Sequence, residues 1–481
     1  MRMHRARSLV VYLVLGLALC ACATPDVGPI NTHVAEVSQL SPEFVPDPAD
    51  DGSTVVGVTF SGGGIRASAF GYGVLRGLDD IVVDGFPKRR TATDDIRMIS
   101  GTSGGAVTAA YFGYKGAGYV DLRERFLLAN AEKELNLSRS PANLVRIYKG
   151  GANDLSTFAA WLNKNVFDGA TYSAFRRSDA PIVWINASDI YNGTPFGFTY
   201  DTFAALCSDL DKVRIADAVA ASAAFPVVFK PVVVSTASTA PKCNYRQPEW
   251  LTHALADPAA SVRLKAYARS LETYQNNPDV DYIKLLDGGI TDNIGVTGLS
   301  MKRAAARTPY GPLSPSAAVK LHNFVFIVVD SSVETRGDWV KTLPGPRLLQ
   351  IPGATSNAGI RSSMREEFDA LRLAAEIWRG ELVAWRCGLP AETVRKLRGT
   401  LAGWNCRDVR FVVEDVTFED FPPAVRARLN AIETRLALPA HQVDLLISAG
   451  REAVRSNVRL QQAFGEARRR AGVGALSASA D

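Results

Sequence analysis

A serine lies in a short glycine-rich motif whose pattern is typical of serine hydrolases. Residues 101–105 read GTSGG, a G-x-S-x-G pattern centred on Ser103. The apolar run 96–99 precedes the motif, and a helical pattern at 106–113 follows it. Between a strand and a helix, small flanking residues allow a tight turn that exposes the serine hydroxyl as a nucleophile. Because glycine-rich turns after strands are common, this motif alone leaves catalysis and a structural turn both open.

A second glycine-rich segment also lies between a strand pattern and a helix pattern. Residues 61–67 read SGGGIRA, and the N–H groups of Gly62, Gly63 and Gly64 could stabilise the oxyanion that develops during acyl transfer. The segment also fits a dinucleotide-binding fingerprint, with Asp84 at the required distance. That alternative leaves the serine motif unexplained, so we favour the oxyanion loop.

A third feature supplies an acid. Residues 285–289 read LLDGG, so Asp287 ends an apolar run and could act as a general base toward a serine. A Ser-His-Asp triad in the α/β-hydrolase order would need a histidine after Asp287, and only His322 and His441 follow it. Neither lies in an obvious loop motif. A serine–aspartate dyad therefore accounts for the sequence better than a triad.

These three features, in this order, resemble the patatin-like phospholipase family. Two further segments are similar to that family, VAASAAFPVVF at 219–229 and INASD at 185–189, and the resemblance covers roughly residues 51–335. Two positions depart from the pattern: Ser61 stands where plant patatins carry an acid, and Ala67 replaces the last glycine of the loop. In both respects the loop is closer to that of the related cytosolic phospholipases A2. Neither change removes a backbone donor.

The resemblance implies a role for each matched residue. Ser103 would be the nucleophile, Asp287 its base, and Gly62, Gly63 and Gly64 the oxyanion hole, with no histidine, metal or cofactor required. The resemblance implies that Arg66 contacts substrate phosphate or organises the glycine loop. The alternative is that it forms a salt bridge at the surface. The remaining matched residues are Ser222 and Phe225, which would shape the substrate pocket, and Asn186, Asp292 and Asn293, which we expect to be structural.

The elements that must position these residues alternate between strand and helix. Short, apolar, β-branched runs predict strands at 54–60, 96–99, 182–186, 282–286, 324–329 and 411–416. Helical patterns lie between them, so we expect an α/β fold with a largely parallel sheet, and the family resemblance implies a three-layer arrangement. The C-terminal third is more helical and carries an apolar stripe that predicts a core-facing helix or, alternatively, one lying on a membrane: Met364, Phe368, Leu371, Ala375, Trp378 and Leu382.

The N-terminus predicts export. A basic start and the apolar run Leu9–Ala21 suit a signal peptide, and the run ends in LCAC, which resembles a bacterial lipobox ending at Cys22. Cys20 fits less well because bulky Leu19 precedes it. A plain secretory signal is the alternative. We expect a lipoprotein, anchored by lipids on Cys22 in the outer membrane and facing the periplasm.

Four segments follow from these patterns. They are a signal peptide at 1–21, a lipidated N-terminus and tether at 22–50, a catalytic domain at 51–340, and a mostly helical extension at 341–481 that packs on the domain. Within the extension we expect residues 465–481 to be frayed or disordered.

Cysteine use and charge limit the class of protein further. Four cysteines follow Cys22, and we predict the pairs Cys207–Cys243 and Cys387–Cys406, with buried free thiols as the alternative. No pair has metal-ligand spacing. The formal net charge of +5 falls to +2 without residues 1–21, which does not suggest a nucleic-acid partner.

The sequence therefore predicts a lipid acyl hydrolase that cleaves acyl esters of phospholipids through Ser103 and Asp287 at a membrane surface. Two alternatives stay open at this point. One is a Ser-His-Asp esterase acting on soluble esters, and the other is a lipid-binding protein with little turnover.

Overall fold

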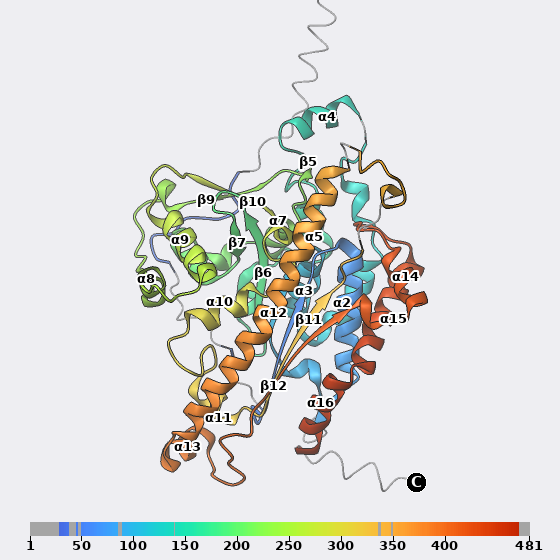
Figure 1. Cartoon of the computed structure of the whole chain (residues 1–481). Coiled ribbons are helices and arrows are strands. Elements are labelled where there is room, and N and C mark those ends of the chain that lie inside the picture. Colours follow the sequence, from blue (N-terminus) through green and yellow to red (C-terminus); the bar gives the residue numbers. More distant parts are fainter. Residues whose placement is uncertain are drawn as a thin grey trace, which may run out of the picture.

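The chain folds around one mixed β-sheet with helices on both of its faces (Figure 1). The computed structural model describes residues 28–37, 45–46, 50–84, 89–138, 140–334, 338–347 and 350–470. Its strands are β1 (Thr54–Phe60), β2 (Val82–Asp84), β3 (Arg90–Thr91), β4 (Ile96–Thr102), β5 (Gly151–Asn153), β6 (Ile182–Asp189), β7 (Thr194–Gly197), β8 (Val227–Phe229), β9 (Val232–Ser235), β10 (Tyr282–Asp287), β11 (Asn323–Asp330) and β12 (Arg410–Thr417). Its α-helices are α2 (Gly64–Asp79), α3 (Gly104–Lys115), α4 (Pro141–Tyr148), α5 (Phe158–Asn165), α6 (Tyr200–Ala205), α7 (Ile215–Ser222), α8 (Glu249–Ala256), α9 (Val262–Asn276), α10 (Thr297–Ala305), α11 (Pro315–Lys320), α12 (Ile351–Cys387), α13 (Ala391–Arg398), α14 (Pro423–Asn430), α15 (Ala440–Ser456) and α16 (Val458–Arg470).

The main sheet confirms the predicted α/β class and the predicted strands. Its order is β12-β11-β1-β4-β6-β10-β9, and β7 pairs with β6 outside this path. The five strands from β12 to β6 run parallel to their neighbours, whereas β10 is antiparallel to both β6 and β9. Short apolar strands of this kind are typical of a sheet that is covered on both faces.

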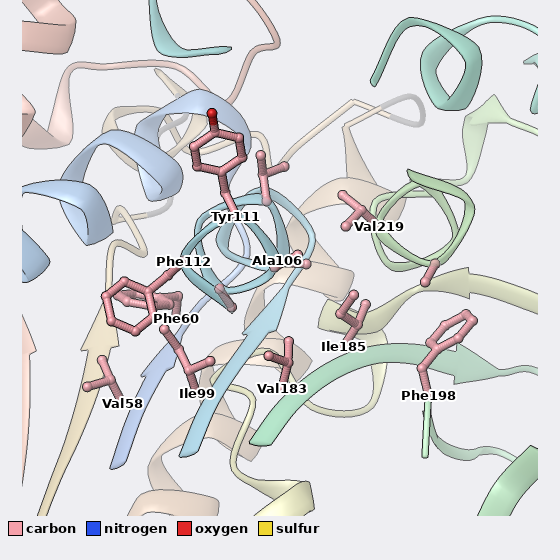
Figure 2. Close-up of a cluster of buried hydrophobic side chains, with 14 of the residues drawn as sticks. Val58, Phe60, Ile99, Ala106, Tyr111, Phe112, Val183, Ile185, Phe198 and Val219 are labelled. Carbon is pink, nitrogen blue, oxygen red and sulfur yellow. The ribbon is translucent and has the colours of Figure 1, made fainter. Parts of the chain in front are cut away.

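Side chains of the central strands alternate between two hydrophobic cores, one on each face of the sheet. The fold therefore has three layers, with the sheet between two layers of helices. Ile99, Val183 and Ile185 point toward α3 and belong to the larger core, as Figure 2 shows. Their neighbours Met98 and Trp184 point the other way, into a core that α12 closes. Because side chains alternate across a strand, each strand contributes to both cores.

Helix α12 faces this second core with the apolar stripe that the sequence predicts. Met364, Leu371, Ala375, Trp378 and Leu382 are all buried in it. The stripe therefore belongs to the protein interior, and the membrane-lying alternative for this helix is wrong. Among the described residues, no helix combines the length and the apolar character needed to span a membrane.

The predicted boundary at 340/341 does not separate two structural units. Strand β12 continues the main sheet beyond β11, in register from Asn323↔Arg410 to Asp330↔Thr417. Helix α15 packs along α2, so residues after 341 complete both the sheet and one helical layer. Helix α16 continues to Arg470, further than the predicted frayed segment allows, and residues 471–481 lie outside the described residues.

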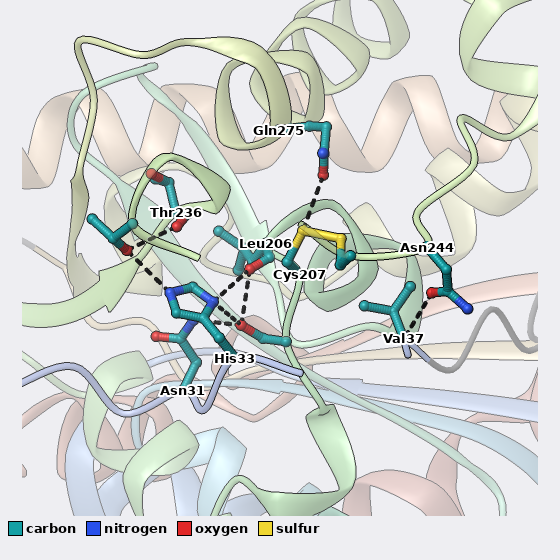
Figure 3. Close-up of a disulfide and its surroundings, with 11 residues drawn as sticks. Asn31, His33, Val37, Leu206, Cys207, Thr236, Asn244 and Gln275 are labelled. Carbon is teal, nitrogen blue, oxygen red and sulfur yellow. Dashed lines mark hydrogen bonds between the residues drawn. A yellow bond between two sulfur atoms is a disulfide. The ribbon is translucent and has the colours of Figure 1, made fainter. Parts of the chain in front are cut away.

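Part of the predicted tether is built into the domain. Asn31 is buried and its amide donates to Ser208 and to the carbonyl of Ser235, while His33 is hydrogen-bonded to the Leu206 carbonyl (Figure 3). A polar segment can be held in this way because its side chains pair with the backbone of neighbouring loops. The predicted disulfides both form, Cys207–Cys243 beside this segment and Cys387–Cys406 at the C-terminal end of α12.

Candidate active site

Ser103 occupies the sharp turn between β4 and α3. Its backbone has φ 53° and ψ −122°, a left-handed conformation that is strained for a residue with a side chain. The flanking glycines are required by close packing, because a Cβ on Gly104 would lie 2.0 Å from the carbonyl oxygen of Gly64. The turn therefore projects the hydroxyl at the carboxyl end of the parallel strands.

Asp287 lies within hydrogen-bonding distance of this serine, although 184 residues separate the two. Ser103 Oγ donates to Asp287 Oδ2 at 2.9 Å, and the N–H of Gly289 donates to Asp287 Oδ1 at 2.8 Å. Burial raises the pKa of the Asp287 carboxyl to about 6, against the opposing effect of these two hydrogen bonds. At neutral pH the group is an ionised carboxylate that accepts protons more readily than an ordinary aspartate.

The register of the sheet brings the two residues together. Strand β6 lies between β4 and β10, and it pairs Asn186 with Thr102 on one side and Ala187 with Asp287 on the other. Asp287 is the last residue of β10, so the antiparallel direction of that strand ends it beside the serine turn. Sheet register fixes this proximity.

Ser222 supports the turn from behind, which differs from the predicted role in shaping a substrate pocket. It is fully buried, its hydroxyl oxygen accepts the N–H of Ser103 at 2.8 Å, and its hydroxyl donates to the Asn186 carbonyl at 2.6 Å. Phe225, predicted for the same pocket, is instead 60% exposed at the surface.

The glycine loop presents two free amides rather than the predicted three. The N–H of Gly62 donates to the Asn293 carbonyl at 3.1 Å and is therefore already engaged. The N–H groups of Gly63 and Gly64 have no hydrogen-bond partner in the part of the chain that the structure describes. Both residues have positive φ, 144° and 61°, which favours glycine. Gly64 packs directly against Gly104, so these donors lie beside the serine turn.

Two further residues, Asn293 and Arg435, complete this loop. The side-chain oxygen of Asn293 lies 2.7 Å from the position of a Cβ on either Gly62 or Gly289, so its amide fits between the two glycine segments. The carbonyl of Arg435 accepts the N–H of Ile65 at 2.8 Å at the start of α2. The Arg435 side chain is itself paired with Glu132. The structural role expected for Asn293 agrees with these contacts, whereas nothing near Arg435 in the sequence signals its role.

Arg66 is buried and holds the loop in place, which matches the loop-organising role that the resemblance implied. Neither contact with substrate phosphate nor a surface salt bridge fits its position. Its Nε donates to the Ser331 carbonyl and its Nη1 to the Ile432 carbonyl, each at 3.0 Å. Burial lowers the pKa of the guanidinium to about 10, and the nearby Asp330 opposes this effect. Arg66 therefore fastens α2 to the end of β11 and to the C-terminal segment.

Replacing Arg66 with methionine tests this assignment. We expect the free energy of unfolding to fall by about 2–4 kcal/mol, because two buried carbonyls lose their donor. Hydrolysis of a phospholipid and of a neutral glyceride should fall by the same factor, measured beside Arg307→Met, a control at an exposed ion pair. If stability is unchanged and only phospholipid hydrolysis falls, the result would instead support a contact between Arg66 and the substrate phosphate.

No histidine among the described residues is hydrogen-bonded to Ser103 or Asp287. His322 precedes β11, at the sheet end opposite the serine, and its Nδ1 contacts Asp408. The other described histidines lie in the N-terminal segment, in α8 and in α15. Geometry thus favours the dyad over the triad. Within the described ranges no cluster of potential metal ligands occurs, and the predicted lipidation site, Cys22, lies outside them.

Comparisons with known proteins identify a family for this chain. A family model described as "Patatin-like phospholipase" matches residues 58–299, half of the chain. A search of curated protein sequences gave no match. Among solved structures, human GIVD cytosolic phospholipase A2 is 14% identical with a TM-score of 0.39; the match covers 88% of this chain and 63% of the human protein. VipD from Legionella pneumophila is 11% identical with a TM-score of 0.32, over 93% of this chain and 73% of VipD.

Proposed function

Because the chain belongs to the patatin-like phospholipase family, a family of lipid acyl hydrolases, we propose that it hydrolyses acyl esters of phospholipids with Ser103 as nucleophile and Asp287 as base. The observation that carries the proposal is the hydrogen bond from Ser103 Oγ to the buried Asp287 carboxylate, beside two unpaired backbone amides. A nucleophile, a base and preorganised donors are the parts that acyl transfer requires.

The geometry supports a two-step reaction. Ser103 Oγ attacks the ester carbonyl carbon while Asp287 Oδ2 takes the hydroxyl proton, and the N–H groups of Gly63 and Gly64 stabilise the oxyanion. Asp287 returns the proton to the departing alcohol oxygen, which leaves an acyl-serine. Asp287 then deprotonates a water molecule that attacks the acyl carbon. The fatty acid is released, and the proton returns to Ser103.

We further propose that lipids on Cys22 hold the protein in the outer membrane, facing the periplasm. The leader sequence and its lipobox-like end support this location. Two acyl chains hold a protein stably at a bilayer, where one chain does not. Attachment would raise the effective concentration of lipid substrate without any additional contact in the active site.

Fatty-acid release from mixed phospholipid vesicles, with and without a chelator, tests the proposal. We expect chelator-resistant release that Ser103→Ala abolishes. If the protein cleaves only a short soluble ester through Ser103, the hydrolase assignment holds and the phospholipid substrate is wrong. If the folded protein turns over neither substrate, a lipid-binding protein with little turnover becomes the better description.

The pH dependence of this reaction follows from the Asp287 carboxyl. A base must be ionised, and burial raises the pKa of this group to about 6. The rate constant kcat/KM for a soluble ester should therefore be half-maximal near pH 6, fall at lower pH and reach a plateau above pH 7. A half-maximum near pH 4 would mean that Asp287 titrates as an exposed aspartate and is not the buried base.

A further inference from the structure

Helix α4 presents an apolar surface to solvent. Within its eight residues, Leu144, Val145, Ile147 and Tyr148 are exposed, and Tyr148 is 92% exposed. A helix of a soluble domain usually turns such residues toward the interior. Clustered exposed apolar side chains of this kind mark a surface that contacts another molecule or a membrane.

This surface continues toward the dyad. Helix α4 directly precedes β5 and packs against it. Strand β5 pairs with β8, and Gly151 lies opposite Val227. Val227 and Phe225 are each 60% exposed, and Val227 has φ 74°, a conformation strained for a β-branched residue. Phe225 follows Ala224, whose carbonyl accepts the N–H of Asp287. The apolar surface therefore reaches the edge of the candidate active site.

We define the α4 face by its exposed apolar residues, Leu144, Val145, Ile147, Tyr148, Phe225 and Val227.

The described part of the chain begins beside the strands that adjoin this face. Gly28, the first described residue, lines a small cavity with Asp154 and Lys230, which flank β5 and β8. The next residues run along β9, where the N–H of Ile30 donates to the Val233 carbonyl. Cys22 precedes Gly28 by six residues, which span at most about 20 Å. Lipids attached to Cys22 would therefore be tethered within that distance of Gly28.

We infer that the α4 face rests on a lipid bilayer, with its apolar side chains inserted at the level where headgroups meet acyl chains. An amphipathic helix lies at that depth when one of its faces is apolar. Ester groups of phospholipids occupy the same level, so docking would bring them to the Ser103–Asp287 side of the molecule. The inference rests on the proposed function for its substrate, but it concerns binding and is testable without turnover.

A fluorescent probe at position 148 tests docking in the full chain. Tyr148→Cys, labelled with an environment-sensitive thiol dye, is placed in a Ser103→Ala background so that vesicles stay intact. The four native cysteines of the described domain are in disulfides and do not take the dye. The matched control is Val458→Cys, 65% exposed, at the start of α16 at the far end of the molecule from α4 (Figure 1).

With phosphatidylethanolamine–phosphatidylglycerol vesicles, we expect a blue shift at position 148 and quenching by brominated acyl chains, and neither at position 458. An unchanged probe at 148 would overturn the inference. A shift that grows with protein concentration and needs no vesicles would also overturn it, because the α4 face would then bind a second copy of the chain.

Activity provides an independent readout. In the double variant Leu144→Ser/Tyr148→Ser, the ratio of vesicle hydrolysis to soluble-ester hydrolysis should fall roughly tenfold, because the substrate is no longer held near the site. An unchanged ratio would contradict docking. Insertion of the probe without any hydrolysis of vesicles by the wild type would instead contradict the proposed function and leave docking in place.

Discussion

Ser103→Ala should lower acyl-ester hydrolysis by at least about 10⁴-fold, because removing the nucleophile of such a unit removes nearly all of its rate enhancement. The alanine variant should fold like the wild type, since the hydrogen bond that supports the turn uses the backbone N–H of residue 103. Rates on a soluble ester and labelling by a fluorophosphonate would be measured together, and both should be lost.

A buried serine away from the turn provides the matched control. Ser270 in α9 is hydrogen-bonded to Thr194 and to the Ala266 carbonyl, and Ser270→Ala should keep full labelling and full activity. If Ser103→Ala retains more than a small fraction of the wild-type rate while the control behaves as expected, another nucleophile does the chemistry.

Asp287→Asn should lower the rate by about 10²–10⁴-fold, the usual contribution of a general base. The carboxamide is nearly the same size and can still accept the N–H of Gly289, so the loss reports the missing charge and not a disturbed loop. Asp217→Asn is the matched control, because Asp217 on α7 is also buried but pairs with Arg214, the residue before that helix. A dyad role for Asp287 is wrong if both variants lose activity equally.

Asp287→Asn should raise the stability of the folded protein, although it lowers the rate of hydrolysis. Burial raises the folded-state pKa of Asp287 from 3.8 to about 6, so between these values the folded protein binds a proton that the unfolded chain does not. The wild type therefore loses stability as pH rises through this window. Asp287→Asn should be more stable than the wild type by up to about 3 kcal/mol above pH 6, at about 1.4 kcal/mol per pKa unit.

Denaturant unfolding at several pH values measures this difference. It should vanish near pH 4, where the carboxyl is protonated in the folded protein, and reach its full size above pH 6. A difference of the same size at every pH would mean that packing, and not ionisation, sets it. Together with the rate, the result would show that the buried carboxylate costs stability at the position where the reaction needs a base.

Local patterns in the sequence were sufficient to predict the strands and to single out Ser103 and Asp287, which the structure places in hydrogen-bonding contact. Runs of β-branched residues predicted β1, β4, β6 and β11, because strands buried on both faces leave that signature. The motifs around Ser103 and Asp287 are each local, and the sheet register then brings their side chains together.

The remainder of the site depends on contacts between distant segments, which no local pattern encodes. The N–H of Gly62 is engaged because Asn293 lies opposite it, and Ser222 is buried because α7 ends behind the serine turn. The resemblance implied that Arg66 could organise the loop, but no local pattern indicates its partner Ile432, which lies 366 positions away and accepts its hydrogen bond. The polar, proline-rich composition likewise predicted a tether at 22–50. Residues 28–37 of that segment are instead held by the domain, where Asn31 is buried among loops.

The contact between Ile65 and Arg435 has a consequence for biosynthesis. The three motifs that carry the proposed chemistry all precede residue 290, but the carbonyl that supports the start of α2 belongs to residue 435. During translation the glycine loop therefore lacks this support until residue 435 has been added. A chain interrupted before that point would carry both the serine and the aspartate with its oxyanion loop incomplete. Under the proposed function, hydrolytic competence would thus depend on a residue that is added about 145 positions after the last of the three motifs.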